Sequence, residues 1–272
     1  MNILVLLKNT PLDASIVNFA TALYKGTEAK LYLLNIVEVN GEVPVQSNGK
    51  VLDDCTEFDL SGYIATAAKN QSYLETIQSE CITECNAFVG HRIRLVQSYI
   101  QENAIDLLVG GAHKTSRAED LFINTFAASI IREIDRPFLT IKCNRDHFAL
   151  NNIGIIRDFI RPVKENLEIV KRLAEVHQSQ VKLIKIKTTD EKRSNEAIHK
   201  KMSAFKAINE LDATTVILEN TTKEKGVKAL IDEHLIDLIV LDRGQPFRFS
   251  APREEAENTT LVNHLYTPIL IH

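Results

Sequence analysis

Residues 105–109 read Ile-Asp-Leu-Leu-Val, and residues 236–240 read Ile-Asp-Leu-Ile-Val. The separation between these two blocks also aligns Pro137 and the apolar residues after it with Pro268 and the apolar residues after it. Two separate pairs that agree on one offset indicate an internal repeat, and a repeat decides the fold before any single element does. The 272-residue chain is also long enough for two ordinary domains.

A second, larger offset superposes the beginnings of the two copies. It places Asn2–Leu6 on Asn152–Ile156, and Ala29–Ile36 on Ser179–Ile186. The offset therefore shortens once along the chain, between Val37 and about Thr83. We predict two domains, residues 1–146 and residues 150–272, of which the first carries the longer connection.

Each copy alternates apolar runs with segments of helical periodicity. Ile3–Leu7 is a continuous apolar run, typical of a strand that is covered on both faces. Thr10, Pro11 and Asp13 predict a helix start with a hydroxyl cap, and the helix is expected to end at Gly26. Further strands are expected at 31–37, 84–89, 107–109 and 138–141, and further helices at 61–79, 93–104 and 126–134. Alternating strands and helices predict an α/β fold of two tandem doubly wound, five-stranded parallel-sheet domains of Rossmann-like type.

Composition excludes several classes of function. The formal net charge of -4 gives no reason to expect nucleic acid or an anionic membrane as a partner. The opening apolar run is too short for a membrane span, so we expect a cytoplasmic protein with reduced cysteines. The four cysteines form no Cys-x2-Cys pair, and no histidines lie at His-x3-His spacing. We therefore predict neither a metal site nor catalytic residues.

The strand sequences resemble one known family in their order and spacing. They are Ile3-Leu4-Val5, Leu33-Leu34-Asn35-Ile36-Val37, Ile105–Gly111 and the final Arg136-Pro137 strand. Together they are similar to the universal stress protein family in its tandem form. The resemblance implies an adenine nucleotide alpha hydrolase-like fold in each copy.

The resemblance also implies where a nucleotide would bind. Many members bind ATP through a Gly-x2-Gly-x9-Gly-Ser/Thr loop after the fourth strand, where glycines let the backbone approach phosphates. Only Gly111 and Thr125 match this pattern here, while Lys114 and Asn124 replace the other two glycines. Side-chain charge on His113 and Lys114 would replace lost backbone amides. The candidate nucleotide contacts, for ATP or AMP, are therefore Gly111, His113, Lys114, Asn124 and Thr125.

The second copy retains less of this pattern. Its equivalent positions are Asp242, Gln245, Glu255 and Ala256, none of which matches. Family members usually carry an acid at the end of the first strand, where the first copy has Lys8 and the second has Asp158. Asp158 is the candidate ligand contact of the second copy.

Three functions follow as hypotheses. The leading hypothesis is a stress-response module that binds a protein partner or a small-molecule ligand without turnover. The alternatives are a nucleotide-binding or weakly ATP-hydrolysing protein that uses the first copy, and a scaffold for assembly. Because fifth strands commonly pair in this family, Phe138–Ile141 and Ile269–Ile271 are expected to form an intrachain pseudo-dimer, and two chains could then form a homodimer. We expect the extra segment at 41–60 to fold over the first crevice or onto a partner.

Overall fold

The computed structural model describes residues 1–52, 57–111, 126–141, 149–243 and 267–272, and these residues divide into two compact units. The first unit comprises the described residues up to Ile141, and the second comprises those from Ala149 onward. The predicted domain boundaries, at residues 146 and 150, fall at or beside the gap between them.

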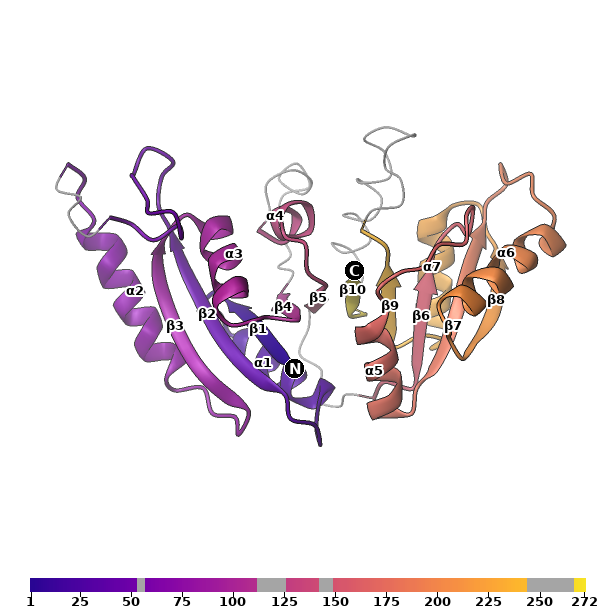
Figure 1. The fold of residues 1–272 in the computed structure, drawn as a ribbon, viewed down its shortest axis with the longest axis horizontal. Coiled ribbons are helices and arrows are strands. Elements are labelled where there is room, and N and C mark those ends of the chain that lie inside the picture. Colours follow the sequence, from indigo (N-terminus) through magenta and orange to yellow (C-terminus); the bar gives the residue numbers. More distant parts are fainter. Residues whose placement is uncertain (53–56, 112–125, 142–148, 244–266) are drawn as a thin grey trace. The chain divides into compact units, whose positions relative to one another are not determined.

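The first unit alternates strands and helices along the chain (Figure 1). Its strands lie in the order β3-β2-β1-β4-β5, and every pairing between neighbours is parallel. Parallel neighbours require crossover connections, which the helices supply. The elements are β1 (Asn2–Leu7), α1 (Asp13–Leu23), β2 (Lys30–Glu38), α2 (Ser61–Leu74), β3 (Ile82–Gly90), α3 (Arg92–Glu102), β4 (Leu107–Gly111), α4 (Phe126–Glu133) and β5 (Phe138–Ile141).

The second unit has the same topology. Its strands lie in the order β8-β7-β6-β9-β10, again all parallel. The elements are β6 (Asn152–Ile156), α5 (Glu168–His177), β7 (Gln180–Lys187), α6 (Asn195–Ile208), β8 (Ala213–Glu219), α7 (Lys223–Asp232), β9 (Leu238–Leu241) and β10 (Ile269–Ile271). The predicted fold class, two doubly wound five-stranded parallel sheets, is confirmed.

Corresponding strands lie at the two offsets read from the sequence. β1 and β6 begin at Asn2 and Asn152, which are related by the larger offset. β3 and β8 begin at Ile82 and Ala213, which are related by the smaller offset, the one that separates the two Ile-Asp-Leu blocks. The change of offset therefore lies between the second and third strands of each unit. The longer connection belongs to the first unit.

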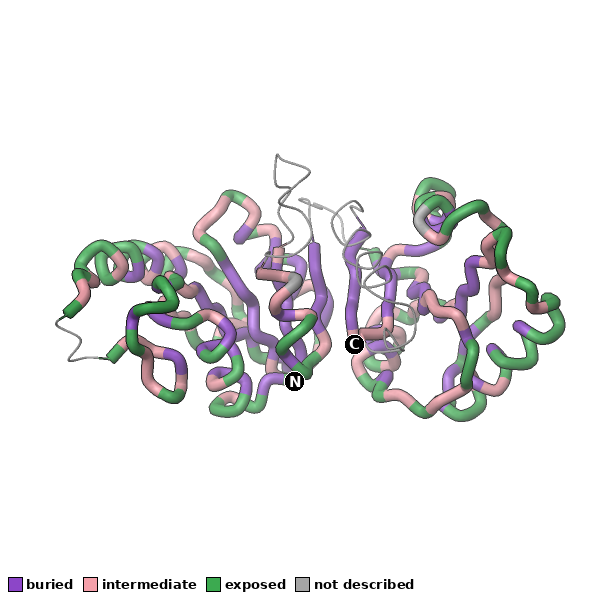
Figure 2. Tube along the Cα trace, turned by 90° about the horizontal axis from the view of Figure 1, so that it is seen from above, coloured by how far each residue is buried: buried purple, intermediate pink, exposed green. Residues whose placement is uncertain are grey.

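The central strands of the first sheet are buried on both faces. Leu4 and Leu6 of β1 belong to a cluster with Val96 of α3 and Ile130 of α4, while the alternate residue Val5 is also fully buried. Because successive side chains point to opposite faces of a sheet, this continuous burial requires helices on both sides. Figure 2 shows buried residues gathered in inner segments of the trace, and most exposed residues lie on helices and loops.

Two local predictions differ from the structure. The predicted hydroxyl cap at Thr10 is wrong: α1 begins at Asp13, and the Thr10 hydroxyl donates a hydrogen bond to the Asp13 carboxylate instead. Helix α2 ends at Leu74 rather than near Ser79, because the chain continues as tight turns, in which Ile77 N donates to Leu74 O at 3.0 Å.

The extra segment of the first unit packs against the edge strand β3. Lys50 and Gly90 form an antiparallel bridge, and His91 N donates a hydrogen bond to Gly49 O at 2.8 Å. Gly49 has a φ of +87°, and a Cβ on Gly90 would lie 2.0 Å from Gly49 O. Both positions therefore require glycine, one for its backbone conformation and one for close backbone approach. The contact covers the carboxyl end of an otherwise open sheet edge.

Candidate functional site

The turn after β1 is organised by a buried carboxylate. Asp13 is 0% exposed and accepts hydrogen bonds from Lys8 N at 3.1 Å, Asn9 N at 2.8 Å and Thr10 Oγ1 at 2.7 Å. Asn9 has a φ of 57°, a left-handed conformation that asparagine tolerates better than most residues. Asp13 therefore holds the backbone from which the Lys8 side chain departs.

A chain of side-chain amides continues from this turn into the sheet. Asn9 donates to Asn70 Oδ1 at 2.8 Å, Asn70 donates to Asn35 Oδ1 at 2.8 Å, and Asn35 donates to Leu7 O at 3.0 Å. Asn35 and Asn70 are both buried, so their amides must find partners inside the protein. The chain of hydrogen bonds fixes α2 against the ends of β1 and β2.

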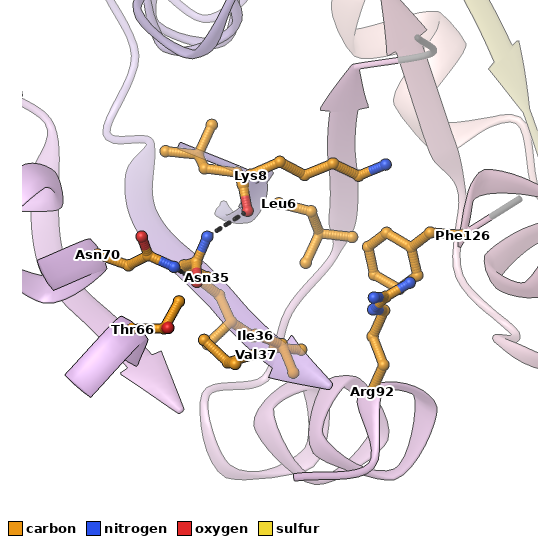
Figure 3. Close-up of a pocket in the computed structure, with 11 residues that line it drawn as sticks. Leu6, Lys8, Asn35, Ile36, Val37, Thr66, Asn70, Arg92 and Phe126 are labelled. Atoms are coloured by element: carbon orange, nitrogen blue, oxygen red, sulfur yellow. Dashed lines mark hydrogen bonds between the residues drawn. The ribbon is translucent and has the colours of Figure 1, made fainter. Parts of the chain in front are cut away.

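A pocket of about 310 Å³ opens beside these amides (Figure 3). It lies at the carboxyl ends of β1 and β2, where open parallel sheets bind their ligands. None of its described lining residues comes from the 41–60 segment. The lining residues are Leu6, Leu7, Lys8, Leu34, Asn35, Ile36, Val37, Thr66, Asn70, Arg92 and Phe126.

Two cations and an aromatic ring form one side of the pocket. The Arg92 guanidinium lies 4.7 Å from the centroid of the Phe126 ring, and Lys8 Nζ lies 5.8 Å from the same centroid. Arg92 also pairs with Glu38 at 2.7 Å, although that carboxylate side chain is 43% exposed. Figure 3 shows Arg92 and Phe126 on the side of the pocket away from Asn35 and Asn70. The pocket therefore has a cationic, aromatic wall and an amide wall.

The Lys8 ammonium group is electrostatically unfavourable in this position. Surrounding protein atoms lower the pKa of Lys8 by desolvation, the positive charge of Arg92 lowers it further, and Asp13 opposes both effects. The side chain is nevertheless accessible to solvent, so it can meet a ligand. An anion beside Lys8 and Arg92 would relieve their mutual repulsion.

The structure tests the placement of only part of the predicted nucleotide site. Gly111 is the last residue of β4, which pairs with β1 beside the pocket. The other four candidates, His113, Lys114, Asn124 and Thr125, lie outside the described residues. Their role as nucleotide contacts stays a prediction.

The second unit places Asp158 among cations. Asp158 accepts hydrogen bonds from Lys185 Nζ at 2.6 Å and from Lys223 Nζ at 3.1 Å. Burial disfavours its charged form, yet Lys223 and Lys185 outweigh that effect and lower the pKa of the carboxyl. Lys185 is 3% exposed and also pairs with Glu191 at 3.4 Å. Whether Asp158 contacts a ligand stays a prediction.

Three positions around the strand ends correspond between the units by the sequence offsets. The first unit has lysine, asparagine and arginine at these positions, and the second has aspartate, lysine and lysine. The second unit thus pairs its charges internally, whereas the first brings two cations to one pocket. The corresponding pairs are Lys8 and Asp158, Asn35 and Lys185, and Arg92 and Lys223.

A second buried charge cluster lies at the carboxyl ends of β6, β9 and β10. Arg157 contacts Glu165 and also Asp242, the latter at 2.8 Å, while its guanidinium lies 4.7 Å from the Phe205 ring centroid. His272 Nε2 lies 3.7 Å from Glu165 Oε2. Burial lowers the pKa of His272 to about 4, and burial raises the pKa of Glu165. The carboxylate of Asp242, which stands where the first copy has Gly111, is held by an arginine.

Sequence reasoning missed most of the pocket. It identified Lys8 only as a departure from a family pattern, and it did not single out Asn35, Asn70, Arg92 or Phe126. One signal was available: Asn35 interrupts an otherwise apolar strand sequence, and a buried amide needs partners. Among the described residues, no three His, Cys, Asp or Glu side chains are grouped so that they could hold a metal ion.

The chain is similar to one protein family and to a curated protein named for that family. The model of the family described as the universal stress protein family matches residues 1–142. The curated protein "Universal stress protein Slr1230" from Synechocystis is 39% identical over 59 residues, which are 22% of this chain and 21% of that protein. The match thus spans about a fifth of that relative's length.

Solved structures resemble the whole chain. A universal stress protein from Archaeoglobus fulgidus has a TM-score of 0.67 at 11% identity, covering 99% of this chain and 97% of that chain. A protein of unknown function from Pseudomonas aeruginosa has a TM-score of 0.61 at 14% identity, covering 99% of this chain and 91% of that chain. At such identities the likeness establishes the fold alone. No described helix is both long and apolar enough to cross a bilayer.

Proposed function

The chain belongs to the universal stress protein family, and on this premise we propose that it acts by binding a small ligand in its first unit without turnover. The ligand is a nucleotide, with ATP and AMP as the candidates. In a stress response the protein would act as a binding module. A protein partner would bind its ligand-bound and ligand-free states with different affinity.

The observation that carries this proposal is the pocket at the ends of β1 and β2. It combines an apolar floor, which includes Leu6 and Ile36, with amides on one side and cations beside an aromatic ring on the other. Small-molecule sites have this composition: mostly apolar, with a few convergent polar groups. A volume of about 310 Å³ lies at the lower end of the range of small-molecule pockets.

Several elements of the proposal rest on the family resemblance and the sequence. Gly111, His113, Lys114, Asn124 and Thr125 are the proposed nucleotide contacts. A cytoplasmic location and an intrachain pseudo-dimer through Phe138–Ile141 and Ile269–Ile271 remain predictions, as does a homodimer. Sedimentation velocity on the full chain would measure the last of these.

Thermal unfolding tests the proposed ligand. We expect ATP, ADP or AMP at millimolar concentration to raise the melting temperature, because a ligand at 100 times its Kd adds about 2.7 kcal/mol to folded-state stability. Measurements with and without magnesium separate a metal-dependent triphosphate site from a metal-independent one. An unchanged melting temperature with all three nucleotides would contradict the proposal.

A pocket-filling variant assigns any shift to this site. Thr66 is exposed on α2 and lines the pocket, so Thr66→Phe should place a ring in the ligand space without disturbing the core. The matched control is Ser72→Phe, at an exposed position of the same helix outside the lining. The nucleotide-induced shift should disappear in the first variant and persist in the second.

A further inference from the structure

We propose that the first unit holds a phosphate monoester of its ligand between the side chains of Lys8 and Arg92, in the role that Asp158 fills for the second unit. The inference rests on the proposed function, because it assigns a binding mode to the pocket described above. It assigns recognition of the anion to two side chains on separate parts of the sequence, in addition to the loop residues proposed above.

In the first unit two cationic side chains lie beside one aromatic ring. Arg92 lies 4.7 Å and Lys8 lies 5.8 Å from the Phe126 ring centroid, and both residues line the pocket. The partner of Arg92 is the half-exposed Glu38, and Lys8 Nζ forms no ion pair within the described part of the chain. One positive charge thus remains uncompensated there, beside an aromatic ring.

In the second unit a carboxylate lies between two cations. At the position of Lys8 it has Asp158, whose two carboxylate oxygens contact Lys185 at 2.6 Å and Lys223 at 3.1 Å. Lys223 begins α7 as Arg92 begins α3. The second unit therefore carries its own anion between two lysines. In the first unit the position of that anion is taken by the cation Lys8, Arg92 corresponds to Lys223, and an anion between these two cations would have to come from a ligand.

The opposite wall defines the other end of the ligand. Asn70 donates to Asn35 and accepts from Asn9, and Asn35 donates to Leu7 O. Each side-chain amide nitrogen carries two N–H groups, so each has a second N–H besides the one used in these bonds. A ligand that spans the pocket should thus carry a hydrogen-bonding group at the amide end and a doubly charged group at the Arg92 end. A phosphate monoester offers two charges and several acceptor oxygens to two cations, which a carboxylate does not.

Calorimetric titration of the full chain with AMP and adenosine tests the assignment. We expect AMP to bind at least tenfold more tightly than adenosine. Lys8→Ala and Arg92→Ala should each weaken AMP binding by about 10- to 100-fold, the usual effect of losing a hydrogen bond to a charged group, and should affect adenosine binding much less. Raising the salt concentration should weaken AMP binding in the wild type more than in either variant.

Two further variants serve as references. Lys69→Ala removes one exposed positive charge from α2 outside the pocket lining, and it should leave AMP affinity unchanged. Lys8→Asp introduces the acid of the second unit, so it should abolish AMP binding and raise the melting temperature by pairing with Arg92. Lys8→Gln, with a side chain of similar length, replaces Lys8→Ala if the latter unfolds.

Different outcomes would refute the two-cation site and the proposed nucleotide function. Equal affinities for AMP and adenosine, with Lys8→Ala and Arg92→Ala without effect, would overturn the two-cation site while the proposed function stands. Weakening by Lys223→Ala instead would also overturn it, because the ligand would then lie in the second unit. If neither AMP nor adenosine binds, the nucleotide proposal fails and pyrophosphate becomes the probe: binding that Lys8→Ala weakens supports the two-cation site, and no binding refutes it.

Discussion

Replacing Asp13 by alanine should destabilise the first unit strongly, because one buried carboxylate satisfies three donors. The hydrogen bonds to it are 3.1, 2.8 and 2.7 Å long, and two of the donors are backbone N–H groups of the turn that follows β1. A hydrogen bond to a charged group contributes about 1.5–3 kcal/mol, and the turn can recover part of this loss from water. We therefore expect a loss of about 3–5 kcal/mol in the free energy of unfolding.

Urea unfolding followed by circular dichroism measures this loss, and amide hydrogen exchange assigns it to the first unit. Since the chain has two units, two transitions are expected, of which only one should shift. Asp212→Ala is the control, because that carboxylate is fully exposed in the turn after α6 and should change stability by less than about 0.5 kcal/mol. A loss below about 1 kcal/mol for Asp13→Ala would refute the reasoning that this carboxylate holds the turn.

Three other contacts of the structure can be tested in the same way. Gly90→Ala should cost about 1–3 kcal/mol and increase proteolysis near Gly49, because the added Cβ would lie 2.0 Å from a backbone oxygen; equal proteolysis of wild type and variant would argue against this contact. Lys185→Met should lower the free energy of unfolding, measured in urea, by about 1–3 kcal/mol. This is less than the roughly 3–5 kcal/mol expected for breaking a fully buried ion pair, because Lys223 still contacts Asp158. An unchanged free energy of unfolding would mean that the pair of Lys185 with Asp158 contributes nothing to stability. The pKa of His272 is lowered from 6.5 to about 4, so the unfolded chain takes up this proton at a higher pH than the folded protein does. The stability that His272 contributes is therefore present above pH 6.5 and lost as the pH falls toward 4, which NMR titration of His272 and the pH dependence of stability in His272→Gln would check. The raised pKa of Glu165 changes stability with pH in the opposite direction.

The sequence was sufficient to predict the sheets because their signal is local and repeated. Runs such as Ile3–Leu7 and Phe138–Ile141 are nearly all apolar, and the repeat supplied each of them twice. Helix ends were predicted less well, because they depend on single hydrogen bonds. Thr10 has the residue type of a cap, yet its hydroxyl donates to a carboxylate that the turn brings close.

The pocket was mostly beyond prediction because its residues meet only in three dimensions. Lys8 and Arg92 are far apart in sequence, and their proximity to one ring depends on β1 lying beside β4 and on the position of α4. A comparison of the two copies offered one accessible clue. Asn35 and Lys185 interrupt apolar strands at the same aligned position, and both turned out to be buried polar groups at a strand end.

The contact between Gly49 and Gly90 has a practical consequence for engineering. It is made by backbone atoms, with His91 N and Gly49 O as the hydrogen-bonding pair. Within the turn the Gln46 side chain donates to Val51 O and the Asn48 side chain accepts from Lys50 N. The exposed Ser47 is therefore a suitable position in this turn for a fluorophore attachment residue, provided that the glycines, Gln46 and Asn48 stay. A reporter attached there would lie on the same unit as the pocket while leaving the residues that line it intact.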